Sequence, residues 1–482
     1  MPINLTDMEK IKELVTYLSR YLIIILMVIY TVQCYTVLAR RRADEKRTVF
    51  LRQNVSMFCI HLVAFAVMFV EQGNVQILLL YAMQALYLLL TLILMTAIYP
   101  RCSRLLLNNM CMLLTIGFIM ITRLSYDSSV KQFKITVAGT VLALIVPVLV
   151  RRILVLTRLG WAYIFFGIGL LGLVLIAARV TNGARLSLDI AGYSFQPSEF
   201  VKIIFVFGMA GLLTEASDLR RLVTATVLAA AHVVILVVSK DLGSALIFFV
   251  AFLVMLFVST HNPFLALAGI LSGAIASVGA YYLFSHVRVR VNVWLDPFSD
   301  YANTGYQISQ SLFSIAAGGW LGTGLGNGSP ASIPYVQQDF MFSAICEELG
   351  CLFGLCLILV CASCFIMIIN VAMKLDNRFY RLVALGLGTT YATQIFLTIG
   401  GGIKLIPLTG VTLPLVSYGG SSVLSTLVMF AIVQGLYTLR KDEKDEKEKE
   451  EQRDDPDPGS YFGYGYRPEE DAVRARDSRS EE

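Results

Sequence analysis

One acidic and two basic residues lie close together in the longest polar stretch of an otherwise apolar chain. Asp296 stands in the segment WLDPF, and Arg288 and Arg290 precede it by eight and six residues. Guanidinium groups bind phosphate oxygens, and a carboxylate can accept the proton of an attacking hydroxyl. These groups together suit a glycosyl transfer in which a lipid diphosphate leaves. An Asx turn before Pro297 is the alternative role of Asp296, because Asp-Pro pairs commonly form turns.

Two shorter polar segments carry further candidates for substrate binding. In QPSEFVK, Glu199 and Lys202 are three residues apart and can pair on one helix face. Asp241 lies in the charged turn KDLGS. Ionisable residues at membrane depth usually mark a functional site, because a charge in a membrane is costly. Helix capping is the alternative role for Ser198 in the first segment, but capping does not explain Lys202.

Two interruptions near the C-terminal end add to these candidates. The segments IPLTG, 406–410, and LPLVSYGGSS, 413–422, break otherwise apolar helices. Such breaks expose backbone donors and acceptors and are tolerated where they line a cavity. We therefore add to the substrate-binding candidates Lys404, Ser417 and Ser421.

The elements that must position these residues are membrane helices. Of the 482 residues, 56% are hydrophobic and only 15% charged, and the mean hydropathy is +0.70. A soluble domain averages about 45–50% apolar and about 25% charged residues. This composition excludes a soluble enzyme, a nucleic-acid binder and a disordered scaffold. We predict an all-α polytopic membrane protein.

Hydropathy predicts about thirteen transmembrane helices, since about 20 apolar residues are needed to cross a bilayer. They fall at 21–39, 54–71, 76–98, 105–121, 135–150, 160–178, 199–214, 222–238, 242–259, 264–284, 342–372, 382–402 and 410–437. The loop between the tenth and eleventh spans, 285–341, is unusually long, which is typical of a functional loop. Within it we predict an amphipathic helix over 304–317 and, over 318–328, glycines that allow tight turns.

The distribution of basic residues predicts the orientation of the spans. Six Lys and Arg residues between 40 and 52 form the densest basic cluster among the loops, so this loop should be cytoplasmic. Alternation then places the N-terminus and the loop 285–341 outside and the C-terminal tail inside. The candidate residues of this multi-pass protein converge on the outer half of the bundle.

The C-terminal region differs from the rest in charge. Residues 440–482 hold 10 basic and 16 acidic residues, whereas the remainder of the chain holds 29 basic and 18 acidic residues. A basic body suits anionic membrane lipids and an anionic substrate. We predict a charged, disordered cytoplasmic tail over 438–482. Its run KDEKDEKEKEE is able to extend the last helix for a few turns through i,i+4 pairs.

The sequence indicates no resident cofactor or metal site. The four histidines are scattered and show no metal-ligand spacing. A divalent cation near Asp296 or Asp241 stays open as an alternative.

Six segments resemble, in order, the signature segments of the SEDS (shape, elongation, division and sporulation) family, the family of RodA, FtsW and SpoVE. They are QPSEFVK (196–202), KDLGSA (240–245), WLDPF (294–298), GYQISQSL (305–312), DFMFSAICEELG (339–350) and IPLTGVTLPLVSYGGSS (406–422). The resemblance covers roughly 105–437, which we assign to a ten-helix core. Residues 1–104 are then an N-terminal addition of three helices.

The resemblance implies a peptidoglycan glycosyltransferase that polymerises lipid II at the outer face of the membrane, for cell elongation, division or sporulation. It implies undecaprenyl diphosphate as the leaving group and a class B penicillin-binding protein as the transpeptidase partner. The family's catalytic aspartate matches Asp296, and its motif residues match Glu199, Lys202 and Asp241. The chain departs from the family pattern at Gln337-Gln338 and in the stretch Gly401-Gly402-Ile403-Lys404.

Two other functions fit part of the pattern. A lipid II flippase would also need many spans, helix breaks and buried charges. Against it, the halves show no internal repeat, and a transporter does not need a long outer loop carrying an aspartate. A membrane hub for a division or elongation complex would suit the charged tail, but it leaves the outer charges unexplained.

Overall fold

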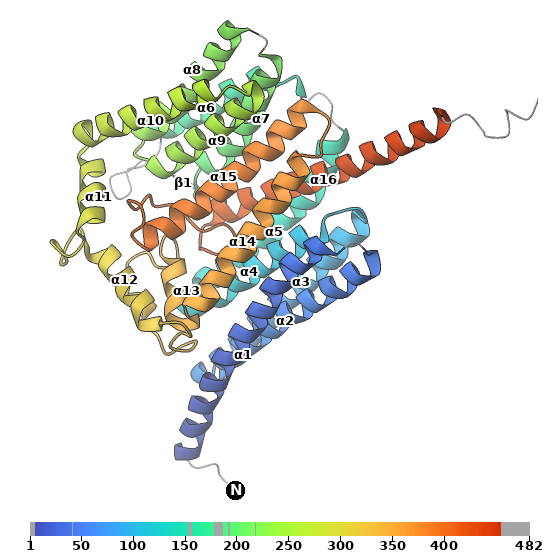
Figure 1. The fold of residues 1–482 in the computed structure, drawn as a ribbon. Coiled ribbons are helices and arrows are strands. Elements are labelled where there is room, and N and C mark those ends of the chain that lie inside the picture. Colours follow the sequence, from blue (N-terminus) through green and yellow to red (C-terminus); the bar gives the residue numbers. More distant parts are fainter. Residues whose placement is uncertain are drawn as a thin grey trace, which may run out of the picture. The chain divides into compact units, whose positions relative to one another are not determined.

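Helices make up most of the described chain. The computed structural model describes residues 5–40, 42–152, 157–177, 187–190, 193–216 and 218–454. Three long helices come first: α1 Leu5–Ala39, α2 Ala43–Gln72 and α3 Val75–Ile98. Ten further long helices follow: α4 Arg104–Leu124, α5 Tyr126–Arg152, α6 Gly160–Ala177, α7 Ser198–Glu215, α8 Leu219–Val238, α9 Leu242–Thr260, α10 Pro263–Leu283, α14 Cys351–Ala372, α15 Arg378–Gly402 and α16 Gly420–Asp454. Figure 1 shows their arrangement.

Short elements lie between the long helices. The strands β1 Leu188–Ile190 and β2 Tyr193–Phe195 form an antiparallel hairpin in which Asp189 pairs with Ser194. The long loop contains α11 Ser285–Leu295, α12 Tyr306–Gly318 and the 3-10 helix η2 Pro330–Ser332, and the short helix α13 Met341–Leu349 follows it. Helix α12 confirms the amphipathic helix predicted for this loop.

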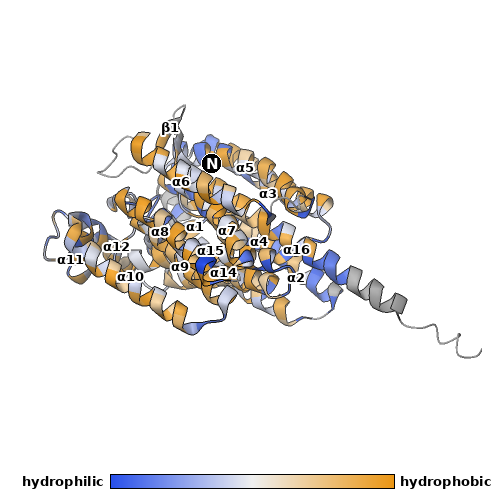
Figure 2. Cartoon of the chain, turned by 90° about the horizontal axis from the view of Figure 1, so that it is seen from above, coloured by the Kyte–Doolittle hydropathy of each residue, from blue (hydrophilic) through white to orange (hydrophobic). Residues whose placement is uncertain are grey.

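Twelve helices in the described residues are long and apolar enough to cross a membrane. The predicted span at 199–214 corresponds to α7, which is not among the twelve. Helix α7 has only 18 residues and three of them are charged, Glu199, Lys202 and Glu215, although most of its residues are buried. Figure 2 shows that hydrophobic residues cover most of the long helices.

The structure divides the predicted span 342–372 into two helices. Helix α13 ends at Leu349 and α14 begins at Cys351, and Gly350 between them has φ 90°. A Cβ atom on Gly350 would come within 2.5 Å of the backbone of Trp320, Leu321 and Gly322. The prediction of one long helix was wrong here, because the glycine-rich segment packs directly against the chain at this point.

Buried residues concentrate at the centre of the first of two compact units, Met1–Thr438. Helix α4 is buried throughout its membrane-spanning window, whereas α10 has no buried residue. The N-terminal helices belong to this unit, since α1 packs on α2 and α14, and α2 on α4 (Figure 1). Buried polar bonds support this packing: Tyr30 donates to Asn109 Oδ1 at 3.1 Å, and Asn109 donates to Ser363 at 3.2 Å.

The second unit, Leu439–Glu482, contains the end of α16. This helix continues to Asp454, so the structure has helix in the first part of the region 438–482 that we predict to be disordered. The alternating Lys and Glu residues of this stretch can form i,i+4 pairs, which stabilise an exposed helix. The remainder of the predicted tail, 455–482, lies outside the described residues.

Candidate functional site

The predicted outer segments meet around one large cavity of about 880 Å³. Its wall combines parts of α5, the β1–β2 hairpin, the α8–α9 turn, α11 and the start of α12. Residues 334–339, the end of α15 with the break that follows it, and the start of α16 complete the wall. Non-helical backbone at 403–419 separates α15 from α16, which confirms the predicted helix break. Segments far apart in the sequence therefore build a single site.

The charged side chains lining this cavity are mostly cationic. Four are basic and two are acidic: Lys131, Lys240, Arg290, Lys404, Asp241 and Asp339. Cations in a cavity with low-dielectric walls raise the local concentration of anions. The cavity can therefore receive an anionic group such as a diphosphate.

Arg290 holds the helix break in place from inside the cavity. Its Nη1 donates to the carbonyl oxygens of Leu408 and Thr409, each at 3.1 Å. Burial lowers the pKa of Arg290, and the nearby carboxylates of Asp339 and Asp241 act in the opposite direction. The guanidinium keeps its charge, since an arginine pKa starts far above neutrality.

Asp241 caps the first turn of α9 at the cavity wall. Its Oδ1 accepts from Ser244 N at 3.1 Å, and its Oδ2 accepts from the Ser198 hydroxyl at 3.0 Å. Burial raises the pKa of Asp241, which these hydrogen bonds partly counteract. Ser198 thus bonds to Asp241, and no side-chain cap of α7 is formed by it, so the capping alternative is not supported.

Asp339 is a cavity carboxylate that the sequence analysis missed. Burial raises the pKa of Asp339 to about 6, and Arg290 opposes this rise. A Cβ atom on Gly410 would lie 3.7 Å from Asp339 Oδ2 and 3.9 Å from Arg290 Nη2, so the two charged groups converge on one point. The sequence does contain one feature that could have identified this residue: an acidic side chain stands immediately before the apolar run Phe340-Met341-Phe342.

Asp296 and Arg288 lie outside the cavity wall, unlike Arg290. Asp296 is exposed at the end of α11, and its Oδ1 accepts from Phe298 N at 3.1 Å, which is the Asx turn considered as its alternative role. Arg288 is exposed and donates to Tyr282 O at 3.1 Å. Of the two arginines, the structure places only Arg290 in the cavity wall, and the binding role expected for Arg288 stays a prediction. Residues two apart on a helix point about 200° apart, so they cannot face one site together.

Of the three candidates at the helix break, two line the cavity and one does not. Lys404 and Ser421 line the cavity, whereas Ser417 is buried behind it and accepts from Leu413 N at 3.1 Å. Ser421 accepts from Gln196 N at 2.9 Å, which ties α16 to the hairpin. Lys404 has a left-handed φ of 61°, and its carbonyl accepts from the Trp294 indole at 3.3 Å.

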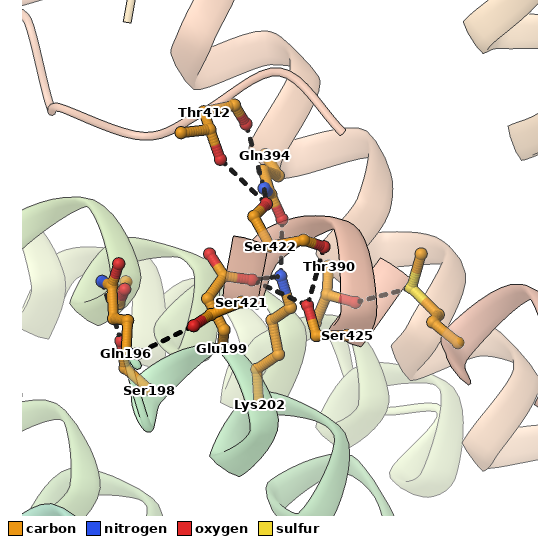
Figure 3. A network of polar contacts seen from close by, with 12 residues as sticks. Gln196, Ser198, Glu199, Lys202, Thr390, Gln394, Thr412, Ser421, Ser422 and Ser425 are labelled. Atoms are coloured by element: carbon orange, nitrogen blue, oxygen red, sulfur yellow. Dashed lines mark hydrogen bonds and ion pairs between the residues drawn. The ribbon is translucent and has the colours of Figure 1, made fainter. Parts of the chain in front are cut away.

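Glu199 and Lys202 form a buried ion pair behind the cavity wall (Figure 3). Their separation of 2.6 Å confirms the predicted pairing on one helix. Lys202 also donates to Gln394 Oε1 at 2.7 Å, and Glu199 accepts from Ser425 at 2.9 Å. Neither residue lines the cavity, so their predicted substrate binding has no support in this geometry.

The same network reaches the cavity through other side chains. Gln394 donates to Thr412 O at 3.0 Å, and the Thr412 hydroxyl donates to Ser422 at 2.8 Å. Thr412 and Ser422 both line the cavity. The ion pair therefore supports the helix break from behind, as Figure 3 shows for the labelled side chains.

Replacing Lys202 alone should destabilise the protein strongly. Lys202→Met leaves the buried Glu199 carboxylate without its cation. Breaking a buried ion pair in this way lowers the free energy of unfolding by about 3–5 kcal/mol. Adding Glu199→Gln in the same chain should restore most of the stability, because no unpaired charge then remains. Thermal unfolding of the purified variants in detergent checks this. A double variant as unstable as the single one would contradict the role given to the ion pair.

Comparisons with known proteins agree over most of the chain. Residues 103–442 match the family FTSW_RODA_SPOVE, described as cell cycle protein. A peptidoglycan glycosyltransferase RodA of Mycobacterium tuberculosis is 36% identical over 372 residues, covering 69% of this chain and 77% of that protein. Stage V sporulation protein E of Bacillus subtilis is 31% identical over 344 residues, covering 67% and 92%.

Solved structures share the fold. A structure entitled "Structural coordination of polymerization and crosslinking by a peptidoglycan synthase complex" contains a chain with a TM-score of 0.61 and 24% identity, covering 70% of this chain and 98% of that chain. The rod shape determining protein RodA of Thermus thermophilus has a TM-score of 0.54 and 23% identity, covering 70% and 97%.

The six ordered segments meet around one cavity, in a helical membrane fold shared with RodA. The family match spans 103–442 and includes every lining residue of that cavity. This chain belongs to the SEDS family, the family of FtsW, RodA and SpoVE.

Proposed function

We propose that this chain is a peptidoglycan glycosyltransferase that polymerises lipid II into glycan strands. The observation that carries the proposal is the mostly cationic cavity that the six family segments build among membrane helices. A polyprenyl diphosphate joined to a sugar has an apolar tail for the bilayer and an anionic group for these cations. The relatives named peptidoglycan glycosyltransferase support the same reaction.

In the proposed reaction, the 4-hydroxyl oxygen of the acceptor sugar attacks C1 of the donor sugar. The bond from C1 to the diphosphate oxygen breaks, and undecaprenyl diphosphate leaves with the electron pair. Arg290 and Lys404 stabilise the charge that develops on the diphosphate. Asp296 takes the hydroxyl proton as general base, a role that rests on the family resemblance.

The exposed position of Asp296 is compatible with this role. The cavity wall includes Val293 and Trp294 before it and Asn303 and Thr304 after it. Asp296 therefore stands between two lining segments, at the edge of the cavity. An acceptor sugar that enters from this edge would meet the carboxylate before the cations.

The surroundings of the reaction follow from the same proposal. The cavity faces the outside of a bacterial cytoplasmic membrane, and the tail lies inside. The partner is a class B penicillin-binding protein, in keeping with the structural neighbour whose title names a peptidoglycan synthase complex. Among the described residues no group of three or more His, Cys, Asp or Glu side chains is placed to hold a metal ion, and the need for a divalent cation stays a prediction.

The test is polymerisation of purified lipid II by the purified chain, alone and with a candidate transpeptidase. We expect glycan strands, seen on a gel. Dye-labelled lipid II in vesicles serves as the second measurement. Movement of lipid II across the vesicle membrane without any glycan, with the partner present, would overturn the proposal in favour of a flippase.

Binding of the diphosphate should tighten as the pH falls from 7 to 5. Asp339 has a pKa of about 6 and faces Arg290, so an anion bound beside it favours the protonated carboxyl. If binding raises that pKa by one unit, the protein with a protonated Asp339 binds the anion about ten times more tightly than the protein with an ionised Asp339. Titration with undecaprenyl diphosphate at several pH values measures this.

Asp339→Asn is the matched control for this prediction. It should bind at least as tightly as the wild type at pH 7 and lose most of the pH dependence. Asp241 and His286 are the other nearby groups that titrate, with raised and lowered pKa values respectively. A pH dependence that survives in Asp339→Asn would assign it to one of them or to the terminal phosphate of the ligand, whose second pKa is about 6.

A further inference from the structure

The N-terminal helices contact the loop that carries part of the cavity wall. Arg20 of α1 donates from Nη1 to the carbonyl oxygen of Gly322 at 2.9 Å. Its Nη2 donates to the Tyr21 hydroxyl at 2.7 Å, and its guanidinium lies over the rings of Tyr17 and Tyr21. Helix α1 precedes the residues 103–442 that match the family. The contact is therefore an addition to the family core.

The glycine-rich segment 318–328 fits closely against these helices. A Cβ atom on Gly324 would lie 3.2 Å from Thr16 Cγ2, and one on Gly326 would overlap the carboxylate of Glu71 in α2. Both glycines have a positive φ, 103° and 97°. Side chains at these two positions would push the segment away from α1 and α2.

The core holds the same segment from the other side. Arg123 of α4 donates to Gly326 O at 3.0 Å and pairs with the buried Glu348 at 3.0 Å. Thr323 N and Gly324 N donate to the backbone of α13 at 2.9 and 3.0 Å. The segment therefore has two attachments, one to the family core and one to the N-terminal addition.

Few hydrogen bonds attach the glycine-rich segment to the N-terminal helices. Beside these close contacts, a pocket of about 470 Å³ lies between α1, α2 and the segment, and its lining includes Lys12, Thr16, Arg20, Glu71, Thr323 and Asn327. Most of the lining side chains are polar or charged, so few apolar contacts join the two surfaces at this pocket. The Arg20 hydrogen bond is thus a principal link between the two surfaces.

The segment leads directly to the cavity. After Gly328 the chain turns through η2, and four of the residues 334–339 line the cavity, Asp339 among them. Ile333, Val336 and Phe340 are buried, which fixes this stretch to its surroundings. Gln337 O accepts from Tyr418 N at 2.7 Å and so connects it to the helix break. A displacement at 318–328 would reach Asp339 over a short, packed path.

We propose that the N-terminal three-helix addition positions the cavity wall for glycosyl transfer, and that Arg20 is the positioning residue that does so through Gly322. The proposal rests on the proposed function for its effect on rate. It gives the addition a role in the reaction that is separate from membrane anchoring.

The test compares Arg20→Ala, Arg20→Lys and Lys12→Ala with the wild type, all as purified full chains. Lys12 lies in the same pocket, two turns from Arg20, and its charge acts on Glu71. Among the described residues it has no hydrogen bond to the segment 318–328, so it controls for loss of a positive charge. Hydrogen exchange is measured over 318–328 and 333–340, and polymerisation kinetics over a range of lipid II concentrations.

We expect Arg20→Ala to speed exchange in both stretches and to lower kcat about tenfold with little change in KM, since small misplacements at a reacting site are costly. Arg20→Lys should recover part of kcat, and Lys12→Ala should match the wild type. Faster exchange in 318–328 alone, or equal effects of Lys12→Ala and Arg20→Ala, would overturn the proposal. If the wild type makes no glycan, the proposed function fails, while the exchange in 333–340 still decides whether Arg20 reaches the wall.

Discussion

Asp296→Asn should abolish glycan synthesis, with a loss of at least about 100-fold, because removing a general base typically costs 10²–10⁴ in rate. The substitution separates the two roles open to this residue. In the structure, Oδ1 of Asp296 accepts from Phe298 N at 3.1 Å, and an asparagine oxygen can accept the same bond. The Asx turn therefore survives, while the ability to take a proton is lost.

Initial rates of lipid II polymerisation measure the effect, with the unfolding temperature as a check on folding. Asp300→Asn is the matched control, since Asp300 lies in the same loop and its carboxylate accepts hydrogen bonds from Asn303 and Thr304. It should polymerise lipid II nearly normally. An Asp296→Asn variant with activity within about twofold of the wild type would leave Asp296 a turn residue, contrary to the family role.

Local patterns in the sequence predicted the local features of the site. The pairing of Glu199 with Lys202 follows from helical spacing, and it is confirmed at 2.6 Å. The amphipathic pattern over 304–317 predicted α12 within two residues at its start. Proline and glycine in 406–420 predicted the break between α15 and α16. In each case residues close in sequence decide the outcome.

Which residues line the cavity could not be predicted from such local patterns. Asp339 and Arg290 lie near each other because residues 334–339 and α11 line the same cavity, and no local pattern in the sequence indicates this proximity. Arg288 and Arg290 look equivalent in the sequence, yet the helical turn of α11 places one outside and the other inside. The depth of Glu199 and Lys202 behind the wall depends on Gln394 of α15, 192 residues beyond Lys202.

Arg290→Ala should lower polymerisation by about 100-fold, the cost of removing one electrostatic group at the site of developing charge. The guanidinium is the basic group that both lines the cavity and bonds to two carbonyls of the helix break, at Leu408 and Thr409. Arg290→Lys keeps a positive charge but cannot reproduce the planar fork, so it should retain intermediate activity. Rates of polymerisation and binding of undecaprenyl diphosphate are the two measurements.

Arg288→Ala is the decisive comparison for this prediction, because the two arginines are two residues apart on one helix. Arg288 is exposed, bonds to Tyr282 O and lies 5.9 Å from the centre of the Tyr281 ring. Its loss should change rate and diphosphate binding by less than about twofold, as for most surface substitutions. If Arg288→Ala lost as much activity as Arg290→Ala, both arginines would have to reach the substrate. The site would then need a different arrangement of α11 during the reaction, since this structure turns only Arg290 towards the cavity.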